Sequence, residues 1–114
     1  MAGPDVRSTP LKRERDDAPV HASIWRFRGD PDELLRRYDG MVAEIPSANM
    51  RLHVCLRAAD GIVLVDTCPA KEVFDAFVAG DSFGALRRKH GLPEPESVED
   101  FPVHAAFVGG RRAE

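Results

Sequence analysis

Four side chains that carry charge or can react stand at every second position between residues 51 and 57. They are Arg51, His53, Cys55 and Arg57. Successive side chains of a β-strand point to opposite faces, so residues two apart share a face. We therefore expect one face of a strand here to present an imidazole and a thiol between two guanidinium groups.

Two histidines lie in segments with the composition of strands, His53 and His104. The ordinary pKa of histidine is about 6.5, so an imidazole can give or take a proton near neutral pH. We predict that His53 and His104 are catalytic proton-transfer groups. The alternative is that each histidine only makes a hydrogen bond at a sheet edge or an interface.

Four further residues are candidates for holding a small molecule: Trp25, Arg26, Asn49 and Cys55. Arg26 stands in mid-strand, and a guanidinium binds carboxylates well. Trp25 would form a pocket wall, Asn49 would hold a carbonyl oxygen, and Cys55 shares the face of His53. The alternatives are a solvated arginine, a core tryptophan and a turn asparagine.

The two cysteines, Cys55 and Cys68, form no CxxC pair and are too few for a disulfide scaffold. His53 and Cys55 would supply two metal ligands, whereas a zinc site needs three or four. We therefore expect reduced thiols, no metal and no cofactor.

Composition bounds the class of protein. The chain has 114 residues, 43% of them hydrophobic, and a formal net charge of -3, which fits one domain. Charges of both signs are mixed, so no nucleic-acid partner is expected. No apolar run is long enough to cross a membrane and no secretory signal is visible, so we predict a cytoplasmic protein.

The chain divides into three parts by composition. Residues 1–20 contain three prolines and mixed charges, which predicts a disordered N-terminal arm. Residues 21–110 should form a single domain. Residues 111–114 are expected to be a frayed tail.

The predicted elements begin with a strand over 21–28. A helix follows, with Asp30 as its cap, Pro31 at its first position and its end at Ile45. Two strands over 51–57 and 62–66 should form a hairpin around a type I′ turn at Asp60-Gly61.

The second half repeats this pattern. A cap-then-proline start precedes a helix ending near Gly80, a short second helix runs from Ser82 to Gly91, and residues 92–100 are expected to be a loop. A last strand is predicted over 101–108. The element order is β-α-β-β-α-β, with the second helix split in two.

This order predicts an α+β, ferredoxin-like fold: a four-stranded antiparallel sheet, with both helices on one face and the strands in spatial order four, one, three, two. The strand over 62–66 is apolar on both faces. An apolar sheet face without helices needs a cover, and a second copy of the sheet provides one through a twofold axis. We therefore predict a homodimer.

We call Arg51, His53, Cys55 and Arg57 the polar row. Their role depends on which face of the strand packs against the helices. If Leu52, Val54 and Leu56 pack on the helices, His53 and Cys55 face the interior of the dimer. If the faces are reversed, the pocket hypothesis fails for this strand.

The stretch VDTCPAKEVFDAFVAGDSFGAL, together with the element order, resembles the dimeric α+β barrel proteins. The resemblance covers roughly Ser23 to Val108, and the nearest group is the antibiotic-biosynthesis monooxygenase-like domains. It implies that two sheets face each other and enclose a pocket in each subunit. Some members oxygenate aromatic polyketides without a cofactor, and others degrade haem.

The haem-degrading members resemble this chain least. Their motif has a histidine shortly after the helix phenylalanine, where this chain has Leu86 and Arg87 after Phe83. They also carry a tryptophan at the end of the third strand, where this chain has Val65, Asp66 and Thr67. Haem is therefore not expected.

The resulting hypothesis is a small homodimeric α+β barrel that binds or transforms a small hydrophobic or aromatic molecule, with a cofactor-independent monooxygenase as its enzyme version. One alternative is a non-catalytic ligand-binding or protein-interaction module. Another is an isomerase or cyclase on the same scaffold.

Overall fold

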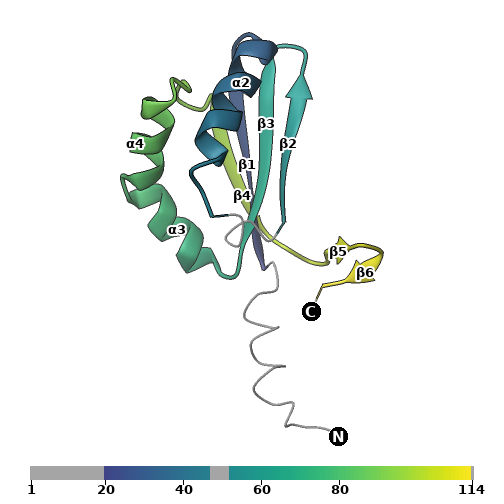
Figure 1. Ribbon diagram of the computed structural model, residues 1–114. Coiled ribbons are helices and arrows are strands. Elements are labelled where there is room, and N and C mark those ends of the chain that lie inside the picture. Colours follow the sequence, from purple (N-terminus) through teal and green to yellow (C-terminus); the bar gives the residue numbers. More distant parts are fainter. Residues whose placement is uncertain (1–19, 47–51, 114) are drawn as a thin grey trace, which may run out of the picture.

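The computed structural model describes residues 20–46 and 52–113. Figure 1 shows the elements in chain order. They are β1 (His21–Arg28), α2 (Pro31–Val42), β2 (His53–Ala58), β3 (Gly61–Cys68), α3 (Lys71–Ala79), α4 (Ser82–Lys89), β4 (Ser97–Pro102), β5 (Phe107–Val108) and β6 (Arg111–Arg112).

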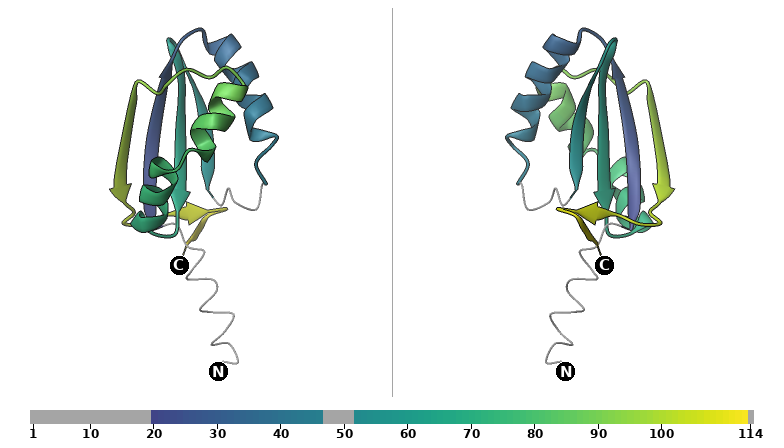
Figure 2. Two further views of the ribbon diagram at one scale, coloured as in Figure 1. Left: turned by 90° about the vertical axis from the view of Figure 1, so that its left-hand side faces the viewer. Right: turned by 90° about the vertical axis from the view of Figure 1, so that its right-hand side faces the viewer.

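The first four strands in chain order form one antiparallel sheet with the spatial order β2-β3-β1-β4. The three helices cover one face of this sheet, and none of the helices in the described residues lies across the other face (Figure 2). This is the ferredoxin-like α+β arrangement, so the predicted fold, its strand order and its split second helix are confirmed.

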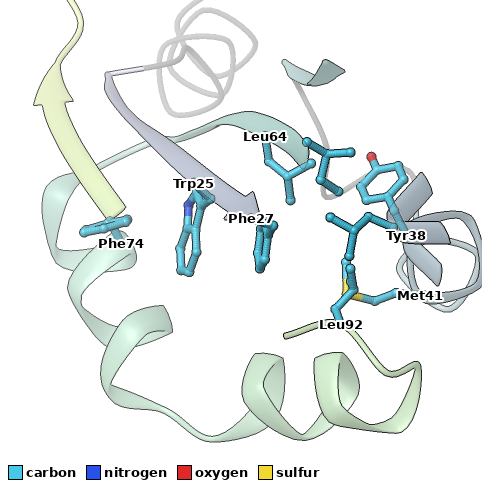
Figure 3. Packing of buried hydrophobic residues seen from close by; sticks show 9 residues of the cluster. Trp25, Phe27, Tyr38, Met41, Leu64, Phe74 and Leu92 are labelled. Carbon is cyan, nitrogen blue, oxygen red and sulfur yellow. The ribbon is translucent and has the colours of Figure 1, made fainter. Parts of the chain in front are cut away.

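The core lies between the sheet and the helices. Trp25 and Phe27 of β1 point from the sheet toward the helices (Figure 3). The other buried hydrophobic residues are Leu34, Tyr38, Met41, Ile62, Leu64, Phe74 and Leu92. Alternation along β1 produces this arrangement, because every second side chain of the central strand is buried.

Helix α2 begins as predicted. The Asp30 carboxylate accepts a hydrogen bond from the Glu33 backbone N–H at 3.0 Å, and Pro31 occupies the first turn. The helix ends at Val42 and not at Ile45. The N–H groups of Glu44 and Ile45 bond to the carbonyls three residues earlier, so a tighter turn completes the helix end.

The start of α3 differs from the prediction. Its cap is Ala70, which makes no side-chain capping bond, so the cap-then-proline start does not form. The end of α4 agrees with the sequence: Gly91 has a φ of +77°, and the Leu92 N–H donates to the Arg87 carbonyl at 3.0 Å. A glycine in this conformation is a common helix terminator.

The predicted type I′ turn at Asp60-Gly61 is wrong. Ala58 pairs with Gly61, so the two loop residues are Ala59 and Asp60, and none of the described non-glycine residues has a positive φ. Gly61 is needed for another reason. A Cβ atom there would lie 1.9 Å from the Phe27 carbonyl oxygen on β1.

The predicted last strand over 101–108 is also misplaced. The strand that pairs with β1 is Ser97–Pro102, which begins four residues earlier, in the segment expected to be a loop, and ends at the second residue of the predicted strand. Its polar residues are tolerated because β4 is an edge strand with one face open, and because Asp100 contacts His21 through a 2.6 Å oxygen–nitrogen distance. His104 therefore lies outside the main sheet.

The predicted N-terminal arm and C-terminal tail can be compared with the structure only in part. The predicted N-terminal arm lies, except for Val20, outside the described residues. Arg111 and Arg112 form β6, which pairs with β5, so these two residues of the expected frayed tail are in a hairpin. Across residues 20–46 and 52–113, no helix has the length and apolar character needed to span a bilayer.

Replacing Gly61 by alanine should lower the free energy of unfolding by about 3 kcal/mol, because the added methyl group meets the backbone of β1 and forces β1 and β3 apart. Urea unfolding followed by circular dichroism measures this change. Gly84→Ala is the matched control. There the nearest atom is the mobile end of Arg88 at 3.1 Å, and alanine favours a helix by up to about 1 kcal/mol. Equal stability of both variants would contradict the argument.

Candidate functional site

The side chains of the sheet divide between two faces according to strand register, because directly paired residues of an antiparallel sheet point to the same side. Trp25 pairs with Leu64, and Leu64 pairs with Cys55, so all three face the helices. We call the other side the open face. It carries Ala22, Ile24, Arg26 and Arg28 of β1, Val63, Val65 and Thr67 of β3, Val54, Leu56 and Ala58 of β2, and Ser97, Glu99 and Phe101 of β4.

Of the two orientations considered for β2, the structure shows the second. His53 and Cys55 face the helices, whereas Val54 and Leu56 lie on the open face with exposed fractions of 41% and 45%. Packing on α2 explains the orientation, since His53 contacts Tyr38 and Cys55 packs against the core. Within one chain, the pocket hypothesis fails for this strand.

His53 is the middle member of a hydrogen-bonded chain of three side chains. Its Nε2 lies 2.7 Å from the Tyr38 hydroxyl and its Nδ1 lies 3.0 Å from an Asp66 oxygen. The Tyr38 and His53 rings are nearly parallel, with 8° between their planes. The chain leads from the partly exposed Asp66 at the end of β3 to the buried Tyr38 on α2, and it fixes the imidazole from both sides.

Burial raises the pKa of the Tyr38 hydroxyl to about 12, with further contributions from Cys55, Asp39 and Asp66. Burial also raises the pKa of the Cys55 thiol, and the nearby Asp39 carboxylate acts in the same direction. Both groups are therefore protonated at neutral pH. Cys55 lacks the thiolate character that a nucleophile needs.

The open face is apolar apart from a few polar groups. Among its large hydrophobic residues, Val54, Leu56 and Phe101 are exposed, and Ile24, Val63 and Val65 are half-buried. Arg26 lies on the central strand β1, between Val63 of β3 and Ser97, the first residue of β4. Its Nε is 4.0 Å from a Glu99 oxygen and about half of its side chain is exposed, so the guanidinium can still bind an anion.

The structure does not bring the other predicted site residues to Arg26. Trp25, His53 and Cys55 lie on the opposite side of the sheet, and Asn49 lies outside the described residues. His104 is exposed in the segment between β4 and β5. The catalytic role of His53 and His104 stays a prediction.

One pair of titratable residues was not anticipated from the sequence. His21, which is buried, lies 2.6 Å from Asp100 and packs against the Phe74 ring at 5.7 Å. The misplaced fourth strand concealed it, because Asp100 was assigned to a loop. In the described part of the chain, no three of the histidine, cysteine, aspartate and glutamate side chains are grouped so as to hold a metal ion.

Comparisons with known proteins identify no family for this chain. No family model and no curated protein matches the chain. Among solved structures, an AsnC family transcriptional regulator from Agrobacterium tumefaciens matches with a TM-score of 0.49 and 18% sequence identity. The match covers 87% of this chain and 57% of the regulator's chain, so the chain spans little more than half of that protein. The resemblance to monooxygenase-like domains stays a prediction.

The pKa of Tyr38 can be measured directly, because the chain has one tyrosine. In the folded protein, tyrosinate absorbance should rise with a midpoint near pH 12, against about 10 for an exposed tyrosine. Because the folded-state pKa is the higher one, the stabilisation by neutral Tyr38 is complete below about pH 10 and is lost as the pH rises toward 12.

The same titration in concentrated urea is the control, and its midpoint should return to about 10. Circular dichroism must show that the native sample is still folded at each pH. A native midpoint near 10 would show that the hydroxyl is open to water and that the hydrogen-bonded chain to His53 does not form.

Proposed function

We propose that this chain is a homodimeric ligand-binding protein, in which two open faces pack together and enclose a small hydrophobic, aromatic molecule that carries an anionic group. The observation behind this proposal is the composition of the open face: valine, leucine, isoleucine and phenylalanine side chains surround Arg26 on a central strand, whereas the second arginine of this face, Arg28 at the end of β1, is already paired with Glu96 at 2.7 Å.

The case for a dimer is the cost of exposing this surface. Val54, Leu56 and Phe101 are each at least 41% exposed on a single chain, and no described helix covers them. A contiguous apolar surface of this kind favours association. A twofold axis lets the same surface cover itself, so the second copy needs no further sequence feature.

The case for a ligand is the position of Arg26. Burying a guanidinium between two apolar sheets without a strong partner is costly. At 4.0 Å, Glu99 is at the outer limit of an ion pair. A carboxylate or enolate oxygen from a bound molecule would pair with the guanidinium, and the surrounding apolar side chains would hold the rest of that molecule.

Binding is favoured over catalysis because the proton-transfer group predicted on β2 is engaged elsewhere. His53 bonds to Tyr38 and Asp66 on the opposite side of the sheet. A cofactor-independent monooxygenase, or an isomerase or cyclase, would need His104 as its base. Each activity stays a prediction, secondary to binding.

The dimer is tested by placing a charge on the open face. Leu56→Glu should raise the dimer dissociation constant by at least about 100-fold, because a carboxylate would be buried against an apolar sheet. Sedimentation equilibrium measures it, and circular dichroism checks folding. Val78→Glu on α3, at a residue of similar exposure on the other side of the sheet, is the control and should remain a dimer. An unchanged dissociation constant for Leu56→Glu would refute sheet-to-sheet packing.

The ligand site is tested with an aromatic anion, 8-anilinonaphthalene-1-sulfonate. Arg26→Gln should weaken its binding by about tenfold through loss of a charge-assisted hydrogen bond, measured by fluorescence titration of the dimer. Arg57→Gln is the control, since Arg57 is also exposed but pairs with Asp32 of α2 at 2.7 Å. If the two variants bind the probe equally well, Arg26 is not the anion site.

A further inference from the structure

The last described residues form a small hairpin at the end of the chain. Phe107 pairs with Arg112 and Val108 pairs with Arg111. Gly109 and Gly110 connect them with φ values of +59° and +81°, which is the pattern of a tight two-residue hairpin turn. The Ala113 N–H closes the ladder on the Ala106 carbonyl at 2.6 Å. We call residues 106–113 the C-terminal hairpin.

Neither face of this hairpin is covered by the part of the chain that the structure describes. Phe107 and Val108 are neighbours on one strand, so they point to opposite faces of the ribbon, and they are 63% and 51% exposed. The hairpin forms a two-stranded sheet of its own, separate from the main sheet. An isolated two-stranded ribbon is at best marginally stable in water. It therefore requires an apolar surface to pack against.

The position of the hairpin indicates where that surface is. It extends from the end of β4 to the side of the main sheet away from α3 and α4, below the start of β2 (Figures 1 and 2). Phe101, the exposed phenylalanine of the open face, lies in the same run of chain just before it. The hairpin thus continues the surface at which we place the second subunit.

The charges of the hairpin also favour the open face of a second copy as its partner. Paired residues share a face of the ribbon, so one face carries Phe107 with Arg112 and the other carries Val108 with Arg111. Each face combines an apolar group with a cation. The open face offers the complement, since its valine and leucine side chains lie on the same surface as Glu99, whose side chain is half exposed.

We propose that the C-terminal hairpin of each subunit packs on the open face of a second copy of this chain and extends the dimer interface at both ends of the twofold axis. This inference rests on the proposed sheet-to-sheet dimer. A twofold axis makes this contact reciprocal. The hairpin of each subunit packs on its partner, and the open face of each subunit covers the hairpin of its partner. The hairpins would then close the two ends of the space between the sheets.

The first test compares dimer dissociation constants by sedimentation equilibrium. The double variant Phe107→Ser with Val108→Ser should bind its second copy about 10- to 100-fold more weakly, because an exposed phenylalanine and valine no longer become buried on association. Val78→Ser is the control, since Val78 is as exposed as Val108 but lies on α3. It should leave the dissociation constant unchanged.

The second test maps the contact. A photo-reactive benzoylphenylalanine replaces Phe107, and subunits of normal and heavy-nitrogen isotope composition are mixed before illumination. We expect cross-links between the two isotopic forms, to peptides from the strands that form the open face, β1, β2, β3 and β4. The same group placed at Val78 should give no cross-link between subunits.

The outcomes separate this inference from the proposed function. A dimer that is broken by Leu56→Glu but unaffected by the hairpin variant, with cross-links inside one chain only, overturns the hairpin inference and leaves the sheet-to-sheet dimer. A dimer broken by the hairpin variant but not by Leu56→Glu supports the hairpin contact and overturns sheet packing. A wild-type protein that stays monomeric overturns both.

Discussion

The register in which β1 pairs with β3 and β4 determines which face of the sheet each strand side chain occupies. Trp25 and Phe27 enter the core from alternate positions of β1, whereas Ile24 and Arg26 point the other way. Burying each large side chain stabilises the fold by about 1.5–3 kcal/mol. A slip of one residue would turn both aromatic residues out of the core and would place Arg26 inside it. The apolar character of the open face is therefore a direct consequence of how the core is packed.

The polar row on β2 has a structural role in this arrangement. Its three described members all face the helix layer: His53 contacts Tyr38, Cys55 packs against the core, and Arg57 pairs with Asp32. Two of these contacts reach α2 directly. An edge strand has a neighbour on one side only, so side-chain contacts with the helix above help to hold it. Residues that looked reactive in the sequence thus attach α2 to the edge of the sheet.

The order of elements was predictable because it depends on periodicity, which a sequence displays directly. The positions of partners across strands were not, because they depend on where a turn closes. A loop at Asp60-Gly61 would have paired Cys55 with Asp66, whereas the observed loop at Ala59-Asp60 places His53 opposite Asp66. The glycine suggested a special backbone conformation, but its real function is to make room for the Phe27 carbonyl.

The fourth strand was missed for a related reason. Ser97–Pro102 contains adjacent acidic residues and ends in proline, which together favour a loop when read locally. Its strand conformation depends on hydrogen bonds to β1 and on the contact between Asp100 and His21, and those partners are distant in sequence. Of the site residues, Arg26 lies within a strand as the sequence indicated, whereas the alternation of β1 puts Trp25 and Arg26 on opposite faces.

The same edge strand has a consequence for how assembly ends. The outer edge of β4 presents backbone groups that another strand could pair with, which is how sheets grow without limit. Glu99 and Asp100 place negative charge along this strand, and Pro102 at its end has no backbone N–H to donate. If β4 of a second copy approached this edge, the acidic side chains of the two strands would repel each other. Pro102 would also leave one hydrogen bond of the new ladder without a donor. The chain thereby discourages open-ended sheet extension and fibre growth from β4, while contact through the face of the sheet remains available.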